Sequence, residues 1–115
     1  MKRNSIIILA FILSACGGVK LLPLSQNDLE RGRNSYPQLS MEELQEGKSN
    51  FEFYCSQCHG LKNPKKHDAE GWKKTINRMA KKAENKSSIK NIEEPIKASI
   101  LTYLVTMSTA ETATQ

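Results

Sequence analysis

The chain of 115 residues has few of the side chains that most metal sites and large cores use. It contains three cysteines and two histidines, and aromatic residues make up 6% of the sequence. A structural zinc site takes four protein ligands. Cys55, Cys58 and His59 lie within one short stretch, and only Cys16 and His67 could be added to them. No strand-like alternation of apolar and polar residues lies near this stretch, which disfavours the βαβ context of a thioredoxin-like dithiol.

The N-terminus has no apolar run long enough to cross a membrane but has the layout of a bacterial secretory signal. Lys2 and Arg3 precede an apolar run, Ile6–Leu13. This run is shorter than the roughly 20 residues that a transmembrane helix needs. We therefore expect residues 1–15 to be a signal peptide and the protein to be exported.

The end of this segment, Leu13–Cys16, has the sequence LSAC and resembles the lipobox of bacterial lipoproteins. In a lipobox the peptide is cut before the cysteine, and that thiol receives a lipid. We expect lipidation at Cys16, on the periplasmic side of the envelope, and Gly17 at the next position slightly favours the outer membrane. The alternative is an ordinary signal peptide in which Cys16 has no role.

Residues 55–59 have the sequence CSQCH, the CxxCH pattern by which haem c is attached covalently to protein. The spacing lets the thiols of Cys55 and Cys58 face one edge of the porphyrin, and the imidazole of His59 becomes the proximal iron ligand. One haem per chain and one lipid account for all three cysteines. The alternative is a haem-free lipoprotein whose CxxC pair binds metal or exchanges disulfides.

Removal of residues 1–15 leaves a chain long enough for one small domain. Residues 16–39 are polar and broken by Pro23 and Pro37, which predicts a flexible tether. The alternative is an arm that packs on the domain through its leucines, which are Leu21, Leu22 and Leu24. We expect the domain over residues 40–108 and a disordered tail over residues 109–115.

Helical spacing of apolar residues predicts three main helices and an all-α domain. The first begins at Ser40, which forms a capping box with Glu43, and runs into Cys55. The second is expected from Asp68, as N-cap, to about Glu84. The third begins between Asn91 and Pro95 and continues to about Met107.

These features resemble the class I cytochrome c family over about residues 40–107. The residues that carry the resemblance are Gly47, Phe51, Tyr54, CSQCH followed by Gly60, and Tyr103 with Leu104. The resemblance implies a small helical domain wrapped around one haem. It also implies that the first and last helices cross where Gly47 and Phe51 meet Tyr103.

The distal iron ligand departs from the usual family pattern, because residues 86–94, before the last expected helix, contain no methionine or histidine. The segment GWKKTINRM instead resembles a group of short bacterial cytochrome domains in which Trp72, Ile76 and Met79 would form the haem wall and Met79 the ligand. Met107, His67 or an open site are the alternatives.

Pro64 has two possible roles next to the haem. Its carbonyl could accept a hydrogen bond from the proximal His59, because such bonds orient a metal-ligating imidazole. Alternatively, Asn63 and Pro64 simply turn the chain.

Basic residues are concentrated between Lys62 and Lys86, where nine Lys or Arg face three Asp or Glu. Such a patch could steer an acidic redox partner or anionic lipid, although an ordinary solvated surface has the same composition. We expect a one-electron carrier with no small-molecule substrate and no nucleic-acid partner. A haem sensor or enzyme with a displaceable sixth ligand is the alternative.

Overall fold

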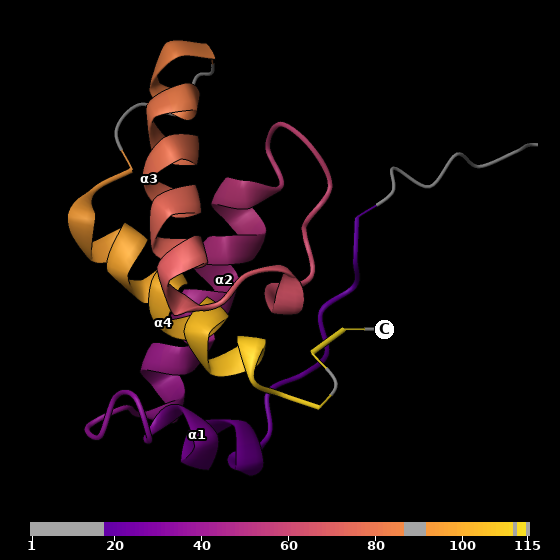
Figure 1. The fold of residues 1–115 in the computed structure, drawn as a ribbon, viewed down its shortest axis with the longest axis vertical. Coiled ribbons are helices and arrows are strands. Elements are labelled where there is room, and N and C mark those ends of the chain that lie inside the picture. The colour runs from indigo at the N-terminus through magenta and orange to yellow at the C-terminus, as the bar shows by residue number, and fades with distance from the viewer. Residues whose placement is uncertain (1–17, 87–91, 112, 115) are drawn as a thin grey trace, which may run out of the picture.

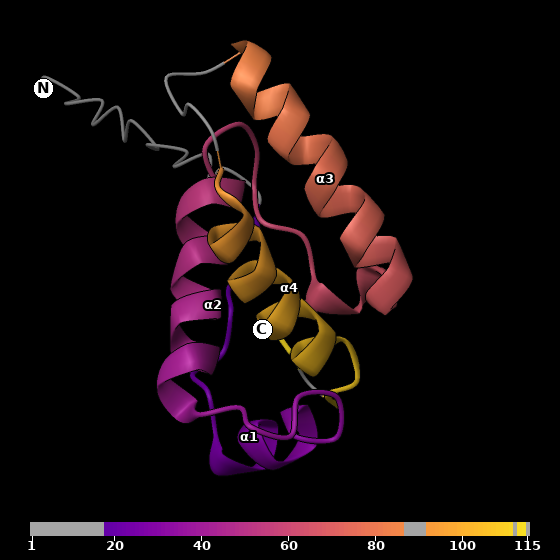
Figure 2. The same cartoon turned by 90° about the vertical axis from the view of Figure 1, so that its left-hand side faces the viewer.

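The computed structural model describes residues 18–86, 92–111 and 113–114, and these residues form an all-α structure (Figure 1). The α-helices are α1 (Gln26–Gly32), α2 (Met41–Cys55), α3 (Ala69–Lys86) and α4 (Glu94–Ser108), and a short 3-10 helix, η1 (Pro64–Lys66), precedes α3. Helix α4, although last along the chain, lies in the middle, with α2 along one side and α3 along the other (Figure 2). The expected signal peptide and Cys16 lie outside the described residues.

The three expected helices are confirmed, and their starts follow from local hydrogen bonds. The Ser40 hydroxyl accepts the Glu43 N–H at 3.1 Å, and the Glu43 carboxylate accepts the Ser40 N–H at 2.9 Å, which completes the capping box of α2. The Asp68 carboxylate accepts the Gly71 N–H at 2.8 Å at the start of α3. Helix α4 begins at Glu94 with Pro95 in its first turn, where a missing N–H costs nothing.

Helices α2 and α4 cross closely at Gly47. A methyl group on Gly47 would collide with the backbone carbonyl of Ser99 and lie 2.9 Å from the Cβ of Tyr103. Tyr103 is fully buried there, and its ring centroid lies 5.8 Å from that of Phe51. The absence of a side chain on Gly47 therefore lets the two backbones approach closely.

Residues 18–39 differ from the expected tether, because they pack along the domain as the alternative arm. Leu29 and Leu39 are buried in the core, with Leu21 and Leu24 partly buried against it. Helix α1 has its own capping box, in which Ser25 and Asp28 bond each other's backbone N–H groups. Burial of these leucines stabilises the segment, so a random-coil description does not apply to residues 18–39.

Arg31 connects α1 to the C-terminal end of α4 through hydrogen bonds. Its guanidinium donates to the Asp28 carboxylate at 2.6 Å and to the Thr106 carbonyl at 3.1 Å. The same guanidinium lies 3.6 Å from the Met107 sulfur. Burial raises the pKa of Asp28, but hydrogen bonds from Arg31 and Ser25 outweigh this, so the pKa is lowered and the carboxylate stays charged.

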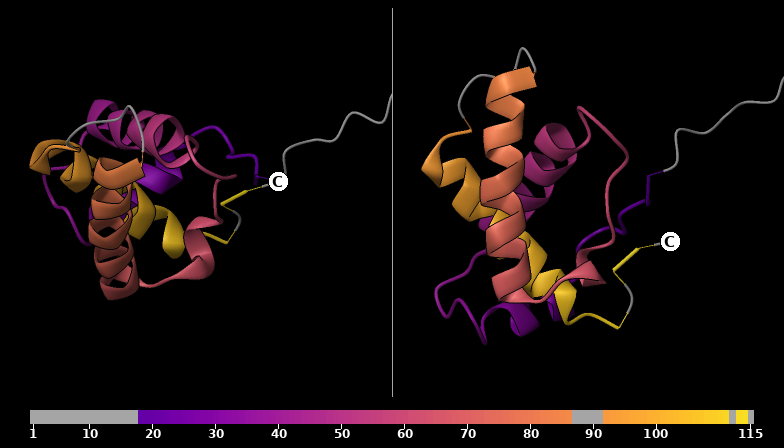
Figure 3. Two further views of the ribbon diagram at one scale, coloured as in Figure 1. Left: turned by 90° about the horizontal axis from the view of Figure 1, so that it is seen from above. Right: turned by 45° about the horizontal axis from the view of Figure 1, so that its top comes forward.

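The C-terminal residues also pack more closely than the expected disordered tail. Ala110 and Ala113 are buried in the core, and Thr114 forms an isolated antiparallel bridge with Leu21. Figure 3 shows this end of the chain beside the N-terminal arm. The two ends of the described chain therefore hold each other in place.

Candidate functional site

The cysteine pair lies where α2 ends. Cys55 is the last residue of the helix and is half-buried, whereas Cys58 and His59 lie exposed in the loop that follows. The Gln57 side-chain amide donates to the Phe53 carbonyl at 2.9 Å, which holds the first turn of the loop against the helix end. The loop thus begins from a rigid point and leaves Cys58 accessible.

His59 has the hydrogen bond that a metal-ligating imidazole usually makes. Its Nδ1 lies 2.8 Å from the Gly60 carbonyl oxygen, which can only accept, so Nδ1 carries the proton and donates. In the neutral ring the other nitrogen, Nε2, is then unprotonated and available to a metal. The carbonyl that orients the His59 imidazole, and leaves its Nε2 free to bind a metal, is therefore that of Gly60 and not that of Pro64.

A cavity of about 110 Å³ separates the end of α2 from α3. Phe51, Cys55 and Leu104 supply its wall from α2 and α4. Trp72, Ile76 and Met79 supply the wall from α3, as expected from their spacing. The loop contributes the two imidazoles, His59 and His67. Residues from three helices and from the segment between α2 and α3 thus bring together sulfur, imidazole and apolar surface.

The rim of this cavity is basic. Lys62, Lys66 and Arg78 all line it, and Thr75 adds a hydroxyl. The sequence predicts a basic patch that includes these cations but does not place them at the cavity. Thr75 and Arg78 do follow from helical spacing, because Thr75 lies one turn from both Trp72 and Met79, and Arg78 lies one turn after Thr75 on the same helix. The positive rim suits a ligand that carries negative groups on one edge.

Trp72 connects the cavity wall to the turn before α3. Its indole N–H donates to the Pro64 carbonyl at 2.7 Å, and both residues are buried. Its ring packs edge-on against His67 at a centroid distance of 4.8 Å and against Phe51 at 6.4 Å. The Pro64 carbonyl therefore accepts its hydrogen bond from Trp72 in this structure and not from His59. Pro64 begins the 3-10 turn, which is the alternative role expected from the sequence.

Of the three expected distal donors, two line the cavity and one does not. Met79 and His67 both border the cavity, and both are half-buried. Met107 is buried near Arg31, one turn after Leu104 in the last turn of α4, and is not part of the cavity lining. Met107 therefore has the packing role that buried methionines usually have.

The cavity has the donor types of a haem site but is too small for a porphyrin as it stands. A volume of about 110 Å³ corresponds to roughly four water molecules at liquid density. The α3 backbone lies close to α4 but not to α1 or α2, and α3 reaches α2 through the contact between the Trp72 and Phe51 rings. A large ligand could therefore widen the site by moving α3 without disturbing the α2–α4 crossing.

The thiol of Cys55 is poorly suited to disulfide exchange. Burial raises its pKa to about 11, so the thiol stays protonated at neutral pH. The thiolate is the attacking species in exchange, and both Cys55 and Cys58 are free in the structure. Within residues 18–86, 92–111 and 113–114, no three His, Cys, Asp or Glu side chains lie close enough to hold a metal ion.

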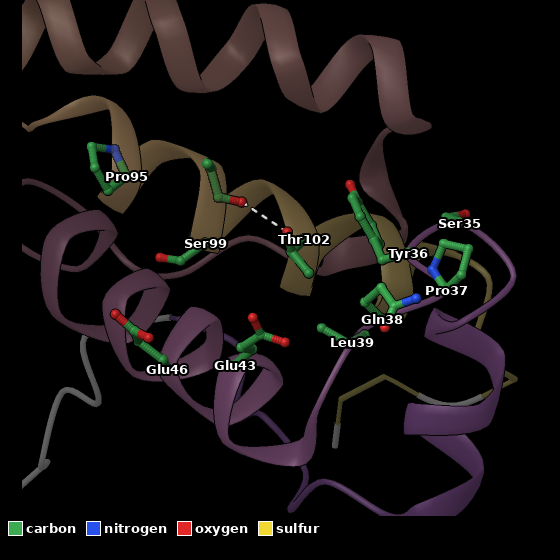
Figure 4. Close-up of a pocket in the computed structure, with 11 residues that line it drawn as sticks. Ser35, Tyr36, Pro37, Gln38, Leu39, Glu43, Glu46, Pro95, Ser99 and Thr102 are labelled. Carbon is green, nitrogen blue, oxygen red and sulfur yellow. Dashed lines mark hydrogen bonds between the residues drawn. The ribbon is translucent and has the colours of Figure 1, made fainter.

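A larger cavity, of about 550 Å³, lies away from the cysteine pair, between α2, α4 and the loop that contains Tyr36 and Pro37 (Figure 4). Glu43 and Glu46 are its charged residues, and its lining has no Cys, His, Met, Lys or Arg. The Glu43 carboxylate is already engaged in capping α2. Size alone therefore does not identify the functional site, because the Cys, His and Met side chains line the smaller cavity.

Comparison with known protein families, with curated proteins and with solved structures found no match to this chain. In the part of the chain that the structure describes, no helix is long and apolar enough to cross a membrane.

Proposed function

We propose that the chain is a cytochrome c-like, monohaem c-type cytochrome that carries one electron between redox partners. The observation that carries this proposal is the shared cavity of Cys55, His59 and Met79. The first two belong to the CxxCH sequence, and the third comes from another helix. A covalently bound haem would supply the one-electron couple, and the protein would bind it and exclude water.

Each residue of the cavity has a role in this proposal. Cys55 and Cys58 would form the two thioether bonds, and His59 would ligate the iron through Nε2. Met79 is the preferred distal ligand, because a thioether from α3 faces the same cavity as His59. Phe51, Trp72 and other apolar side chains would exclude water, and together with a Met ligand this favours a raised reduction potential.

The first test is an optical spectrum of the purified protein in both redox states, after expression with the haem-attachment machinery. We expect a Soret band and, in the oxidised form, the sulfur-to-iron charge-transfer band of Met ligation. Met79→Ala should abolish this band, whereas Met107→Ala, the matched control, should retain it. Loss of the band in Met107→Ala alone would contradict the ligand assignment.

A haem sensor or enzyme is the second candidate, and the paired donors His67 and Met79 favour it. Both line the cavity, so one could replace the other or be displaced by a small ligand. Carbon monoxide binding to the reduced native protein would support this function over electron transfer. The haem-free dithiol alternative would have to use Cys58 as the attacking thiol, because Cys58 is exposed whereas burial raises the pKa of the Cys55 thiol.

The proposal includes a place in the cell and a type of partner. The signal-like N-terminus and the lipobox at Cys16 suggest a lipoprotein on the periplasmic side of a membrane, with Gly17 favouring the outer membrane. The basic rim, formed by Lys62, Lys66 and Arg78, suits an acidic redox partner. Labelling with radioactive palmitate, compared between the wild type and Cys16→Ala, tests the anchor.

A further inference from the structure

The N-terminal arm lies directly on the loop that carries His59. The backbone N–H of Val19 donates to the Leu61 carbonyl at 3.1 Å. A methyl group on Gly18 would lie 2.8 Å from the Leu61 nitrogen and 3.0 Å from the Gly60 Cα. Gly18 therefore packs against the backbone immediately after His59, at the start of the described chain.

The C-terminal residues hold this arrangement from a second side. Leu21 pairs with Thr114 in an antiparallel bridge, and the Thr114 hydroxyl accepts from the Asn63 amide at 3.2 Å. The Lys65 ammonium group donates to the Glu111 carbonyl at 2.6 Å. The arm, the loop after His59 and the C-terminal end thus form one corner, in which the arm cannot move independently without breaking several contacts.

This packing fixes how far the expected anchor can be from the cysteine loop. Cys16 precedes Gly18 by two residues, and consecutive Cα atoms are 3.8 Å apart. The Cα of Cys16 therefore lies within about 7.6 Å of the Gly18 Cα, whatever the conformation between them. A tether of residues 16–39 would instead have allowed a separation of roughly 25 Å.

We propose that lipidated Cys16 holds the loop of residues 55–62 against the membrane surface, so that the protein has one orientation on the bilayer. This inference rests on the proposed lipidation of Cys16. Lys20, Lys62 and Lys65 are exposed around this corner, so the surface it presents suits anionic lipid headgroups. Helix α2 ends at Cys55, where the loop of residues 55–62 begins, and in Figure 1 its start lies farther than its end from the indigo N-terminal end of the described chain. The start of α2 would therefore be farther from the bilayer than its end.

The orientation has a consequence for electron exchange. The haem-binding loop would face the headgroups, and a partner would reach the haem at the membrane plane and not in the open periplasm. A partner embedded in or anchored to the same membrane fits this geometry better than a freely diffusing one.

Spin labels on the lipidated full chain, in vesicles of phosphatidylcholine and phosphatidylglycerol, test the orientation. One label is placed at Lys62→Cys, beside the arm, and a matched label at Gln45→Cys, which is also exposed but lies ten residues before the end of α2, about 15 Å along its axis. The haem is kept reduced, so that its iron does not broaden the signals. We expect a water-soluble nickel chelate to collide with the Lys62 label several-fold less often than with the Gln45 label.

Two further variants separate the arm from the anchor. Insertion of about 20 Gly and Ser residues before Gly18 leaves the packed arm intact but adds a flexible span of roughly 25 Å, so the difference between labels should disappear. Val19→Pro removes the N–H that Leu61 accepts, whereas Val19→Ala retains it. We expect Val19→Pro to reduce the difference between labels and Val19→Ala to preserve it.

The possible failures are distinct. If mass spectrometry finds lipid at Cys16 but the two labels are equally accessible, the inference is overturned while the proposed cytochrome function stands. If Cys16 carries no lipid, the anchor and the orientation are both overturned. A missing Soret band, with lipid present and the labels unequal, overturns the cytochrome proposal alone and supports the orientation.

Discussion

The two sides of α4 are built differently. On the side of α2 the backbones meet at Gly47, with no space for even a methyl group. On the side of α3 the contact leaves a cavity of about 110 Å³ beside Phe51 and Trp72. A close backbone crossing tolerates little change, whereas a wall of side chains on one helix can be displaced. The α2–α4 side therefore acts as the scaffold and the α3 side as the adjustable wall of the site.

Phe51 belongs to both sides, so its removal should have the largest effect. Its ring contacts Tyr103 at the crossing and Trp72 at the cavity. We expect Phe51→Ala to lower the free energy of unfolding by about 3 to 5 kcal/mol, as measured by urea denaturation. Phe53→Ala is the matched control, because this side chain is 58% exposed and its loss should change stability by less than about 0.5 kcal/mol. An equal loss of unfolding free energy in the two variants would show that the burial of Phe51 does not contribute to stability.

The crossing itself can be tested by adding bulk at Gly47. Gly47→Val should cost about 3 kcal/mol of stability, because the new side chain would collide with the Ser99 carbonyl and approach Tyr103. Ser49→Val changes an exposed position of the same helix and corrects for the intrinsic helix preference of valine. If the two variants unfold at the same urea concentration, the close approach is not needed for stability.

On the cavity side, a smaller and more local effect is expected from Trp72→Phe. Loss of the indole N–H leaves the buried Pro64 carbonyl without this donor, at a cost of about 1 to 2 kcal/mol. Hydrogen exchange should quicken in α3 and in residues 64–67 while the middle of α2 stays protected. Uniform acceleration in all helices would mean that the two sides are not separable.

The smallest effect is a pH dependence that belongs to the cavity side of the haem-free, reduced protein. Burial raises the pKa of Cys55 from 9.0 to about 11, so the unfolded chain loses this proton first as pH rises. Stability is therefore fully present below pH 9 and falls between pH 9 and 11, by about 1 to 2 kcal/mol for a half-buried thiol. Cys55→Ala, or attachment of haem through Cys55, should remove this contribution, and Cys58→Ala should keep it. Burial also raises the pKa values of Tyr36 and Tyr103, so a further decline above about pH 10 should remain in every variant.

The expected helices were the most predictable part of the fold, because their starts depend on near neighbours in sequence. Ser40 with Glu43 and Asp68 with Gly71 form local hydrogen bonds that the residue types alone predict. Helix α1 was missed although Ser25 and Asp28 have the same capping pattern. Seven residues are too few to show an apolar period, and the neighbouring prolines and glycine indicated a loop.

The site was predictable only in part. The spacing of Trp72, Ile76 and Met79 on one helix face indicated a wall, and all three line the cavity. The contact of His67 with Trp72, and the position of Met107 outside the cavity lining, depend on tertiary packing. The periodicity of apolar residues along one helix does not predict such contacts. The packing of Gly18 on Gly60 likewise joins residues far apart in the chain.

The central claim is that haem is bound covalently through Cys55 and Cys58, and the intact mass of the exported protein tests it most directly. We expect the mass of residues 16–115 plus one haem and one lipid modification, and a Cys55→Ala/Cys58→Ala double variant that lacks the haem mass alone. A wild-type chain that is exported in the presence of the attachment machinery and carries no haem mass would show that Cys55 and Cys58 do not bind haem.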